Sequence, residues 1–392
     1  MDTVYLDWAS TSPIDPEVLD GLNRNHRELF GNPSSLHDFG RHASSTLTDA
    51  RNTLAATLGV PPKQLIFTSG GSEANSIVFL SLLRKKRRGR VLISSVEHPS
   101  VYEYAAVLQD AGFDVREIPV DEAGLVQPDA LEKLLSRDTQ LVSVMTVNNE
   151  TGAIQKISQI GALLRRYEEA ETAAIHFHTD AVQAYGKLEL PLKEMQIDSA
   201  SFSSHKLSGP KGVGMLYLSR EMPTVLAGGG QENGYRPGTE NVPALAAFAR
   251  AAERRCETLQ ESYEAAERRR DRLLECIRTI DGARAIPFDS TSEATDLRQY
   301  SPYILSFTVS PLPGEVMVRV LNDKGFAVST GSACSSNKRK KRSRVLRALS
   351  IGENEAFGAV RVSTGWSTSD EEIDRFCDTL KRELPQLLKT VR

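Results

Sequence analysis

A lysine in the stretch "SFSSHKLSGPKGVG" (201–214) is the first residue whose surroundings suggest chemistry. Lys206 follows two serines and a histidine at the end of a β-rich run, and a turn rich in glycine and proline comes next. An amine at the end of a buried strand can lose its water shell and become nucleophilic, as a lysine that forms a Schiff base requires. A surface lysine in a turn would fit this stretch equally well.

A carboxylate occupies a similar place in "HTDAVQ" (178–183), where Asp180 ends another β-rich run. A carboxylate just past a buried strand costs free energy unless a cation or a hydrogen-bond donor meets it. The protonated nitrogen of a pyridine ring would be a suitable partner. An N-cap for the following segment is the alternative, because aspartate caps helices well.

Three further strand ends carry polar groups. "FTSGGSEANS" (67–76) places Gly70, Gly71 and Ser72 before a helix, where N–H groups and a hydroxyl can cradle a phosphate, although a plain helix start also fits. His98 follows the next strand and could stack on a ring, although a lone histidine is more often structural. The amide of Asn149, in "TVNNETG", can donate to a phenolate or carbonyl oxygen. Together these five strand ends supply the parts that bind pyridoxal phosphate.

The elements that must position these residues are short strands that alternate with helical patterns. The runs that we predict as strands are 64–69, 90–95, 114–120, 141–147, 173–179 and 199–204. Such alternation is typical of a mostly parallel sheet covered on both faces. Ligands bind such sheets at the carboxyl ends of the strands, where the polar groups lie.

The rest of the chain predicts a smaller α+β unit. A charged helical region (239–280) is followed by strands at 303–309, 326–330 and 359–364, a helix between the first two, and a last helix from about Asp370. We predict three parts: an N-terminal segment (1–20) that packs with the small domain, a large cofactor-binding domain (21–255), and a small C-terminal domain (256–392) that carries Cys334.

Composition is that of an ordinary globular protein. The 392 residues carry a formal net charge of −3, which gives no whole-chain case for nucleic-acid binding. Apolar runs are short and the start lacks the pattern of a signal peptide, so we expect a cytoplasmic protein without a membrane segment. The four cysteines are widely spaced, which predicts neither a disulfide framework nor a zinc site of the usual spacing.

Four motifs in one order, "HTDAVQ", "SSHKLSGPKG", "RPGTEN" and "STGSACSS", resemble those of the cysteine desulfurases of the class V aminotransferase family. The likeness runs from "LDWASTSPIDP" to "VRVSTGW", nearly the whole chain. It implies a fold type I pyridoxal phosphate enzyme of the α/β class. Its large domain would hold a mostly parallel seven-stranded sheet, beside a smaller α+β C-terminal domain.

The resemblance also implies a role for each matching residue. Lys206 would form the Schiff base, Asp180 would meet the pyridine nitrogen, and His98 would stack on the ring. The other cofactor contacts would come from Gly71, Ser72, Asn149, Gln183, Ser203 and His205. Thr239 would reach the phosphate of the neighbouring subunit, which implies a homodimer. The carboxylate of the substrate, L-cysteine, would be bound by Asn32, Asn149 and Arg361.

Cys334 falls at the position of the family's nucleophile. The resemblance implies that its thiol takes sulfur from L-cysteine, becomes a persulfide and passes the sulfur to an acceptor protein, such as an iron–sulfur scaffold. "GSACSS" is similar to the long-loop subgroup. Two departures stand out: the basic run Lys338–Arg344 replaces a weakly acidic loop, and Trp366 replaces a second basic residue after Arg361. We expect the six cations of the run to be solvated, to move with Cys334 and to steer an acidic acceptor.

Two other functions remain open from the sequence. The same fold could act as a selenocysteine lyase or as another class V lyase or transaminase. A binding or regulatory protein that keeps the cofactor without turnover is the third hypothesis. The presence of Lys206, Asp180, Cys334 and Arg361 together favours the desulfurase.

Overall fold

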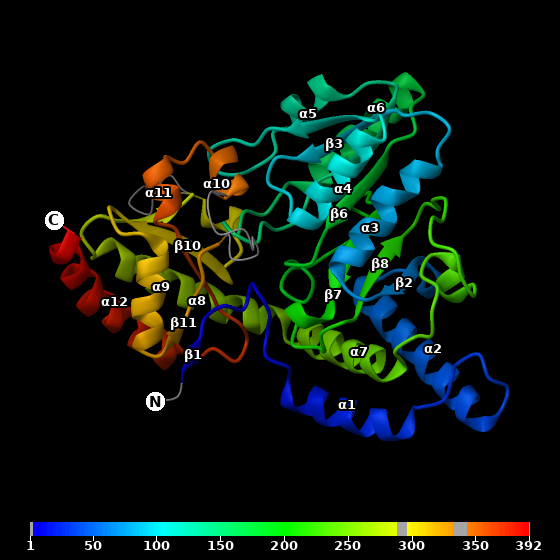
Figure 1. Cartoon of the computed structure of the whole chain (residues 1–392), viewed down its shortest axis with the longest axis horizontal. Coiled ribbons are helices and arrows are strands. Elements are labelled where there is room, and N and C mark those ends of the chain that lie inside the picture. The colour runs from blue at the N-terminus through cyan, green and yellow to red at the C-terminus, as the bar shows by residue number, and fades with distance from the viewer. Residues whose placement is uncertain (1–2, 288–295, 332–342, 392) are drawn as a thin grey trace.

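The computed structural model describes residues 3–287, 296–331 and 343–391. Cys334 and the first five cations of the basic run lie outside these residues. Figure 1 shows a large unit built on one wide sheet beside a smaller unit, with both ends of the chain on the side of the smaller one.

A seven-stranded sheet forms the centre of the large unit, with the strand order β2-β8-β7-β6-β5-β3-β4. Four neighbouring pairs are parallel, and the two pairs that β8 makes, with β2 and β7, are antiparallel. The strands are β2 (Leu65–Thr68), β3 (Arg90–Ser94), β4 (Asp114–Ile118), β5 (Thr139–Ser143), β6 (His176–Asp180), β7 (Ser199–Ser203) and β8 (Gly214–Leu218). The predicted fold class, a mostly parallel seven-stranded sheet in an α/β protein, is confirmed.

Helices cover both faces of this sheet. Side chains alternate along each strand, so that Val91 and Ile93 pack on one face while Leu92 packs on the other. The face of Val91 meets α3 (Gly71–Ser81) and α4 (Pro99–Asp110), and the face of Leu92 meets α2 (Asp38–Leu58), α5 (Pro128–Leu134), α6 (Ile157–Glu171) and α7 (Val242–Glu257). Because α3 and α4 begin directly after β2 and β3, their N-termini lie at the ends of those strands.

The smaller unit has a three-stranded antiparallel sheet with the order β12-β10-β9. Its strands are β9 (Ala283–Ile286), β10 (Ile304–Val309) and β12 (Val360–Ser363). The helices of this part of the chain are α8 (Leu259–Arg278), α9 (Gly314–Asp323), α10 (Arg344–Ala348), α11 (Glu353–Phe357) and α12 (Asp370–Val391). The helix predicted over 239–280 is two helices, because Thr258 between α7 and α8 has a non-helical ψ of 17°.

The N-terminal segment joins the two units. Strand β1 (Val4–Tyr5) pairs in parallel with β11 (Phe326–Ala327), and Val4 and Leu6 pack in the apolar cluster of the smaller unit. Helix α1 (Pro16–Glu28) then packs along α7 of the large unit. The residues between β1 and α1 therefore cross from one unit to the other. The domain boundaries at residues 20 and 255 stay a prediction.

Candidate active site

Lys206 lies at the carboxyl end of β7, in the single 3₁₀ turn Ser204–Lys206. Its Nζ donates to the backbone oxygens of Ala9 (2.5 Å) and Ser10 (2.6 Å). Ser12 holds the same segment in place, because its backbone nitrogen and its hydroxyl both donate to the carbonyl of His205. The crossing segment between β1 and α1 therefore lies against the lysine that the sequence singled out.

Asp180 is the last residue of β6 and is buried. Its Oδ1 accepts from the backbone nitrogen of Val182 (3.0 Å), which is the local capping contact that the sequence left open. Its Oδ2 accepts from Nδ2 of Asn75 (2.9 Å), a residue of α3. The second contact is not local, so Asp180 does more than cap the next turn: a buried carboxylate is held in one orientation at the sheet edge.

His98 caps the N-terminus of α4, and its Nδ1 accepts from the backbone nitrogen of Ser100 (3.1 Å). Burial lowers the pKa of His98; the charge of Asp180 opposes this shift and the charge of Lys206 adds to it. His98 is therefore a neutral ring at neutral pH, with the carboxylate and the amine both close enough to affect it. This is the arrangement that a ring-stacking residue needs.

The start of α3 fits a phosphate group. Its N-cap, Gly70, provides no side-chain hydrogen bond to the helix, so the first N–H groups keep their donor capacity. A Cβ on Gly71 would come within 2.5 Å of Cγ2 of Val182, which explains the need for glycine there. A Cβ on Gly70 would lie 3.7 Å from Oγ of Ser203, so that hydroxyl is beside the same helix start. Ser72 is exposed in the first turn of α3.

Gln183 and His205 also contact the crossing segment. The amide nitrogen of Gln183 donates to the carbonyl of Ala9 (2.8 Å), and Nδ1 of His205 lies 3.0 Å from Oγ1 of Thr11. Burial, with smaller effects of nearby lysines, lowers the pKa of His205 to about 4, so its ring is neutral. One region thus holds a helix start that suits a phosphate, a carboxylate and a neutral ring that suit a pyridine, and an amine that suits an aldehyde. These residues fit pyridoxal phosphate.

Arg361 reaches this region from β12 of the smaller sheet. Its Nη1 donates to the carbonyl of Asn149 (2.8 Å), and its Nη2 contacts Oδ1 of Asp7 (2.8 Å) and Oγ of Ser10 (2.7 Å). The guanidinium is buried. Ser10 therefore contacts both predicted cations, Lys206 through its carbonyl and Arg361 through its hydroxyl.

Two predicted residues are not brought to this region within the described chain. Asn32 lies on the exposed connection between α1 and α2, where its Oδ1 accepts from the backbone nitrogen of Ser34 (2.9 Å). Thr239 is exposed just before α7. No hydrogen bond between described residues joins either side chain to Lys206 or Arg361, so their roles stay predictions.

Sequence reasoning missed two charged groups. Asp7 pairs with Arg361, and Nζ of Lys187 donates to Oε1 of Gln183 (3.1 Å). Lys187 is buried, which lowers its pKa to about 7, and the charges of Lys206 and Arg361 add to the shift. Lys187 follows Gln183 by four residues, and this spacing could have indicated the contact between them. Such a spacing predicts a contact at the site only when both residues are known to be buried.

The chain on either side of residues 332–342 lies beside the same site. Oγ of Ser343 donates to Oε2 of Glu150 (2.6 Å), and a Cβ on Gly331 would lie 3.1 Å from the same oxygen. Burial raises the pKa of Glu150, while Ser343 and Arg361 oppose the shift. The half-buried carboxyl of Glu150, next to Asn149, therefore lies close to both Gly331 and Ser343.

Arg344 is the one cation of the basic run that the structure describes. It begins α10 and pairs with Oε1 of Glu117 (2.8 Å). Arg344 is exposed, as predicted for the cations of the run, but the prediction that it moves with Cys334 is wrong, because the N-cap Ser343 and this ion pair fix it to the fold.

Trp366 has an aromatic and a cationic neighbour. Its ring centroid lies 5.4 Å from that of Trp8, and the guanidinium carbon of Arg255 lies 4.3 Å from the centroid of Trp366. Arg255 is also paired with Asp15 (2.7 Å). The missing basic residue of the family pattern is thus replaced by an aromatic side chain that packs against an arginine of α7.

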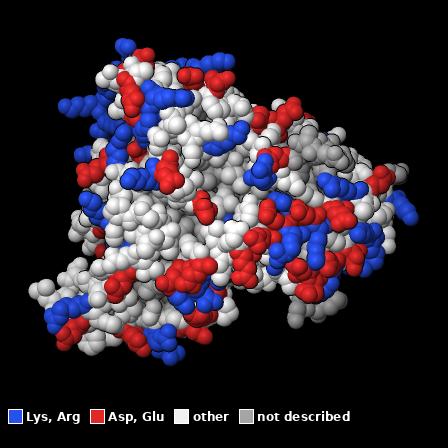
Figure 2. All heavy atoms as spheres, turned by 180° about the vertical axis from the view of Figure 1, so that it is seen from behind, with Lys and Arg blue, Asp and Glu red and all other residues white. Residues whose placement is uncertain are grey.

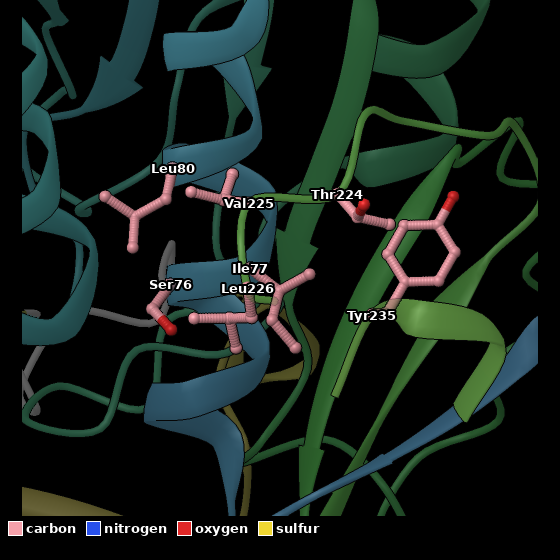
Figure 3. Close-up of a pocket in the computed structure, with 7 residues that line it drawn as sticks. All are labelled: Ser76, Ile77, Leu80, Thr224, Val225, Leu226 and Tyr235. Atoms are coloured by element: carbon pink, nitrogen blue, oxygen red, sulfur yellow. The ribbon is translucent and has the colours of Figure 1, made fainter. Parts of the chain in front are cut away.

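The hollow drawn in Figure 3 lies elsewhere. Ser76, Ile77 and Leu80 of α3 face Val225, Leu226 and Tyr235 across a space of about 20 Å³, with Thr224 at its edge. That volume is close to the size of one water molecule, and none of the predicted catalytic residues lines it. It is therefore not the candidate active site.

Glu97, the residue before His98, is a buried acid that connects two strand ends. Its Oε1 accepts from Oγ of Ser94 (2.8 Å) and from the backbone nitrogen of Met145 (2.7 Å), which ties the end of β3 to the segment after β5. Burial raises the pKa of Glu97 to about 8, and the charge of Asp180 acts in the same direction. The side chain is therefore a neutral acid at pH 7.

This buried acid gives a pH-dependent stability. Because the folded-state pKa is above the unfolded value of 4.5, the contribution of Glu97 is fully present below pH 4.5 and is lost as the pH rises toward 8. Between pH 5 and pH 8 we expect the free energy of unfolding of the parent to fall by up to about 4 kcal/mol relative to that of Glu97→Gln, which has no acid to ionise. Urea unfolding at both pH values measures this, with the exposed Glu103→Gln as control; equal pH profiles for parent and Glu97→Gln would contradict it.

With the fold and the site described, comparison with known proteins identifies the class. The family model "Aminotransferase class-V" matches residues 4–376, so the chain belongs to that family. The mitochondrial cysteine desulfurase of Eremothecium gossypii is 37% identical over 380 residues, which is 95% of this chain and 74% of that protein. Cysteine desulfurase IscS of Dictyoglomus turgidum is 34% identical over 388 residues, covering 98% of this chain and 95% of its own.

A solved structure agrees with these relatives. A "NifS-like protein" superposes with a TM-score of 0.88 at 34% identity and covers 98% of this chain and 100% of its own. The family and the fold predicted from the motifs are therefore confirmed, and the names of the relatives support the predicted activity.

Proposed function

We propose that this protein is a cysteine desulfurase that uses pyridoxal phosphate to convert L-cysteine to L-alanine and passes the sulfur on as a persulfide of Cys334. The observation that carries the proposal is that Lys206 and Arg361 both contact Ser10, while Asp180 and Lys206 are both close enough to His98 for their charges to shift its pKa. No two of these four residues come from the same strand or helix, so local sequence preferences alone do not account for their convergence.

The cofactor, when bound, supplies an electron sink for negative charge on the substrate carbon. Asp180, held by Asn75, would face the ring nitrogen, and the neutral ring of His98 would lie against the cofactor. The N-terminus of α3 with Ser72, Ser203 and His205 would hold the phosphate, and Gln183 and Asn149 the phenolic oxygen and its surroundings. Lys206 would hold the cofactor covalently and move protons at the substrate carbon.

Substrate recognition falls to Arg361. A guanidinium matches a carboxylate with two parallel hydrogen bonds, and Oδ1 of Asp7 already accepts from Nη2 at 2.8 Å. The carboxylate of L-cysteine would take the place of that contact, with Asn149 and Asn32 as further partners. Because the guanidinium is buried, water competes weakly for it.

Cys334 would accept the sulfur. Its thiolate attacks the substrate sulfur, an S–S bond forms, the C–S bond breaks, and the electron pair stays on the carbon skeleton, which a proton converts to alanine. Gly331 lies beside Glu150, and three residues span at most roughly 10 Å of extended chain. The thiol of Cys334 would therefore lie no further than this from Gly331, and we propose that it reaches the substrate sulfur.

Exposed apolar side chains indicate where a second copy of the chain could bind. Phe30, Leu36 and Phe39 expose large apolar side chains, with Leu36 at 88% exposure. Val225 and Leu226 are partly exposed and line one hollow with Pro237, two residues before Thr239. We propose that a second copy covers such surfaces and that Thr239 reaches its phosphate. In Figure 2, cationic and acidic groups are interspersed over the face shown.

The acceptor would be a protein such as an iron–sulfur scaffold, and the location would be the cytoplasm. Among the described helices, none is long and apolar enough to cross a membrane.

The five cations from Lys338 to Arg342 would steer an acidic acceptor. Replacing all five with Ser or Gln should slow persulfide transfer to that acceptor several-fold at low salt, because long-range attraction raises the encounter rate. Sulfide release to a small thiol should stay the same. Transfer rates over a salt series measure this; a parent rate that does not change with ionic strength would rule out steering.

The proposed activity itself is tested with the purified protein, pyridoxal phosphate and L-cysteine. With a thiol reductant we expect alanine and sulfide in equal amounts. Without reductant, alanine formation should stop after about one turnover per Cys334, because the persulfide has no acceptor. Absence of alanine under both conditions would refute the proposal.

A further inference from the structure

A chain of buried polar groups runs behind Asp180. Nε2 of His176 lies 2.8 Å from Oγ of Ser199, and the same Oγ lies 2.8 Å from Nδ1 of His178. Nε2 of His178 lies 3.0 Å from Oδ1 of Asn75, whose Nδ2 donates to Asp180 (2.9 Å). All five side chains are less than 6% exposed, so water cannot replace a missing partner.

The chain branches at Asn75. Nδ2 of Asn75 also donates to Oγ of Ser100 (2.9 Å), and that Oγ lies 2.8 Å from Nδ1 of His98. The two hydrogens of one amide therefore serve the carboxylate on one side and, through Ser100, the stacking histidine on the other. One amide group is therefore linked to both Asp180 and His98, the two residues proposed above to face the cofactor ring.

Only one arrangement of protons satisfies every link when Asp180 is a carboxylate. Its Oδ2 needs a donor, so the nitrogen of Asn75 faces it and the oxygen of Asn75 faces His178. His178 then carries its proton on Nε2 and accepts from Ser199 at Nδ1, and Ser199 accepts from Nε2–H of His176. Burial lowers the pKa of both His176 and His178 to about 3, which keeps both rings neutral at neutral pH.

We infer that Ser199 and His178 are positioning residues: through the oxygen of Asn75 they keep its amide nitrogen against Asp180 and Ser100, and so hold Asp180 and His98 in place for the cofactor. The reversed amide would put an oxygen against the carboxylate and would leave Oγ of Ser100 without its donor. This inference rests on the proposed function, because it assigns Asp180 and His98 to the cofactor.

The chain offers a matched pair of serines for the test. In the sheet, His178 of β6 is flanked by Ser199 of β7 and by Ser143 of β5. Both serines are fully buried, but Oγ of Ser143 has no hydrogen-bond partner among the described residues, whereas Ser199 bridges two histidines. Ser199→Ala and Ser143→Ala therefore remove the same atom beside the same ring, and only the first breaks the chain.

We expect Ser199→Ala to lower kcat for L-cysteine roughly tenfold, the effect of one lost buried hydrogen bond, with KM nearly unchanged. The dissociation constant of pyridoxal phosphate, titrated into the apoprotein, should rise several-fold. Ser143→Ala should match the parent in all three quantities. If the two variants behave alike, or if Ser199→Ala changes KM alone, the inference is wrong.

Neutron diffraction from crystals of the parent holoenzyme gives an independent answer if Ser199→Ala does not fold. We expect hydrogen on Nε2 and not on Nδ1 of His98, His176 and His178. Hydrogen on Nδ1 of His178 would overturn the inference. Failure of the proposed function is distinguishable, because the parent itself would then form no alanine from L-cysteine.

Discussion

Replacement of Lys206 by alanine is expected to lower alanine formation by at least about 10³-fold, because in the proposed mechanism the same amine holds the cofactor and moves the proton. The variant should also lose the visible absorbance of covalently held pyridoxal phosphate. Both effects are measured on one sample, by absorbance and by alanine assay with L-cysteine. Without the amine, the carbonyl of Ala9 would still accept from Gln183, and the carbonyl of Ser10 would lose the hydrogen bond from Lys206.

Lys211→Ala is the matched control for this experiment. Lys211 is an exposed lysine in the same glycine-rich turn, five residues further on. It should keep parental absorbance and turnover. Parental alanine formation by the Lys206 variant would remove this residue from the mechanism and leave it as the surface lysine of the alternative interpretation.

Replacement of Cys334 by alanine is expected to separate the two halves of the reaction. In the proposed mechanism the cofactor and its partners Lys206 and Asp180 act on the carbon skeleton, so the variant should bind pyridoxal phosphate and change its absorbance with L-cysteine. Sulfide release should fall by at least about 100-fold, since the thiolate that takes the sulfur is missing. Sulfide assays and absorbance spectra of the same preparation give the result.

Cys256→Ala controls for the loss of a thiol as such, since Cys256 lies on α7 and burial raises its pKa to about 11, which makes it a poor nucleophile. It should release sulfide at the parental rate. Normal desulfuration by Cys334→Ala would exclude the persulfide role and favour the selenocysteine lyase, which a comparison of L-cysteine with L-selenocysteine would then decide.

The strand ends of the large unit could be predicted from sequence because parallel strands place their carboxyl ends along one edge. Asp180 ends β6, and Lys206 and His98 follow β7 and β3, so finding the strands was enough to group the three residues. Strand β8 was missed, since its short run "GMLYL" directly follows the turn after Lys206 and has no alternating pattern. Its antiparallel pairing with β7 depends on that turn.

Contacts between distant parts of the chain could not be predicted. Asp7 and Arg361 are 354 residues apart and pair only because β1 packs with the smaller unit. The break at Thr258 is also invisible in the sequence, because no glycine or proline marks it and the charged helical pattern continues through it. Nothing in the sequence indicates that Asn75 differs from the other residues of its helix. In the structure its amide nitrogen donates to both Ser100 and Asp180.

Ser10 limits the distance between the two cationic side chains of the proposed site. Its carbonyl accepts from Lys206 and its hydroxyl contacts Arg361, so the amine and the guanidinium are separated by no more than one amino-acid residue and two hydrogen bonds, of 2.6 and 2.7 Å. In the proposed mechanism the nitrogen of the substrate lies near Lys206 and its carboxylate is bound by Arg361. An α-amino acid, which carries both groups on one carbon, is short enough to meet this condition.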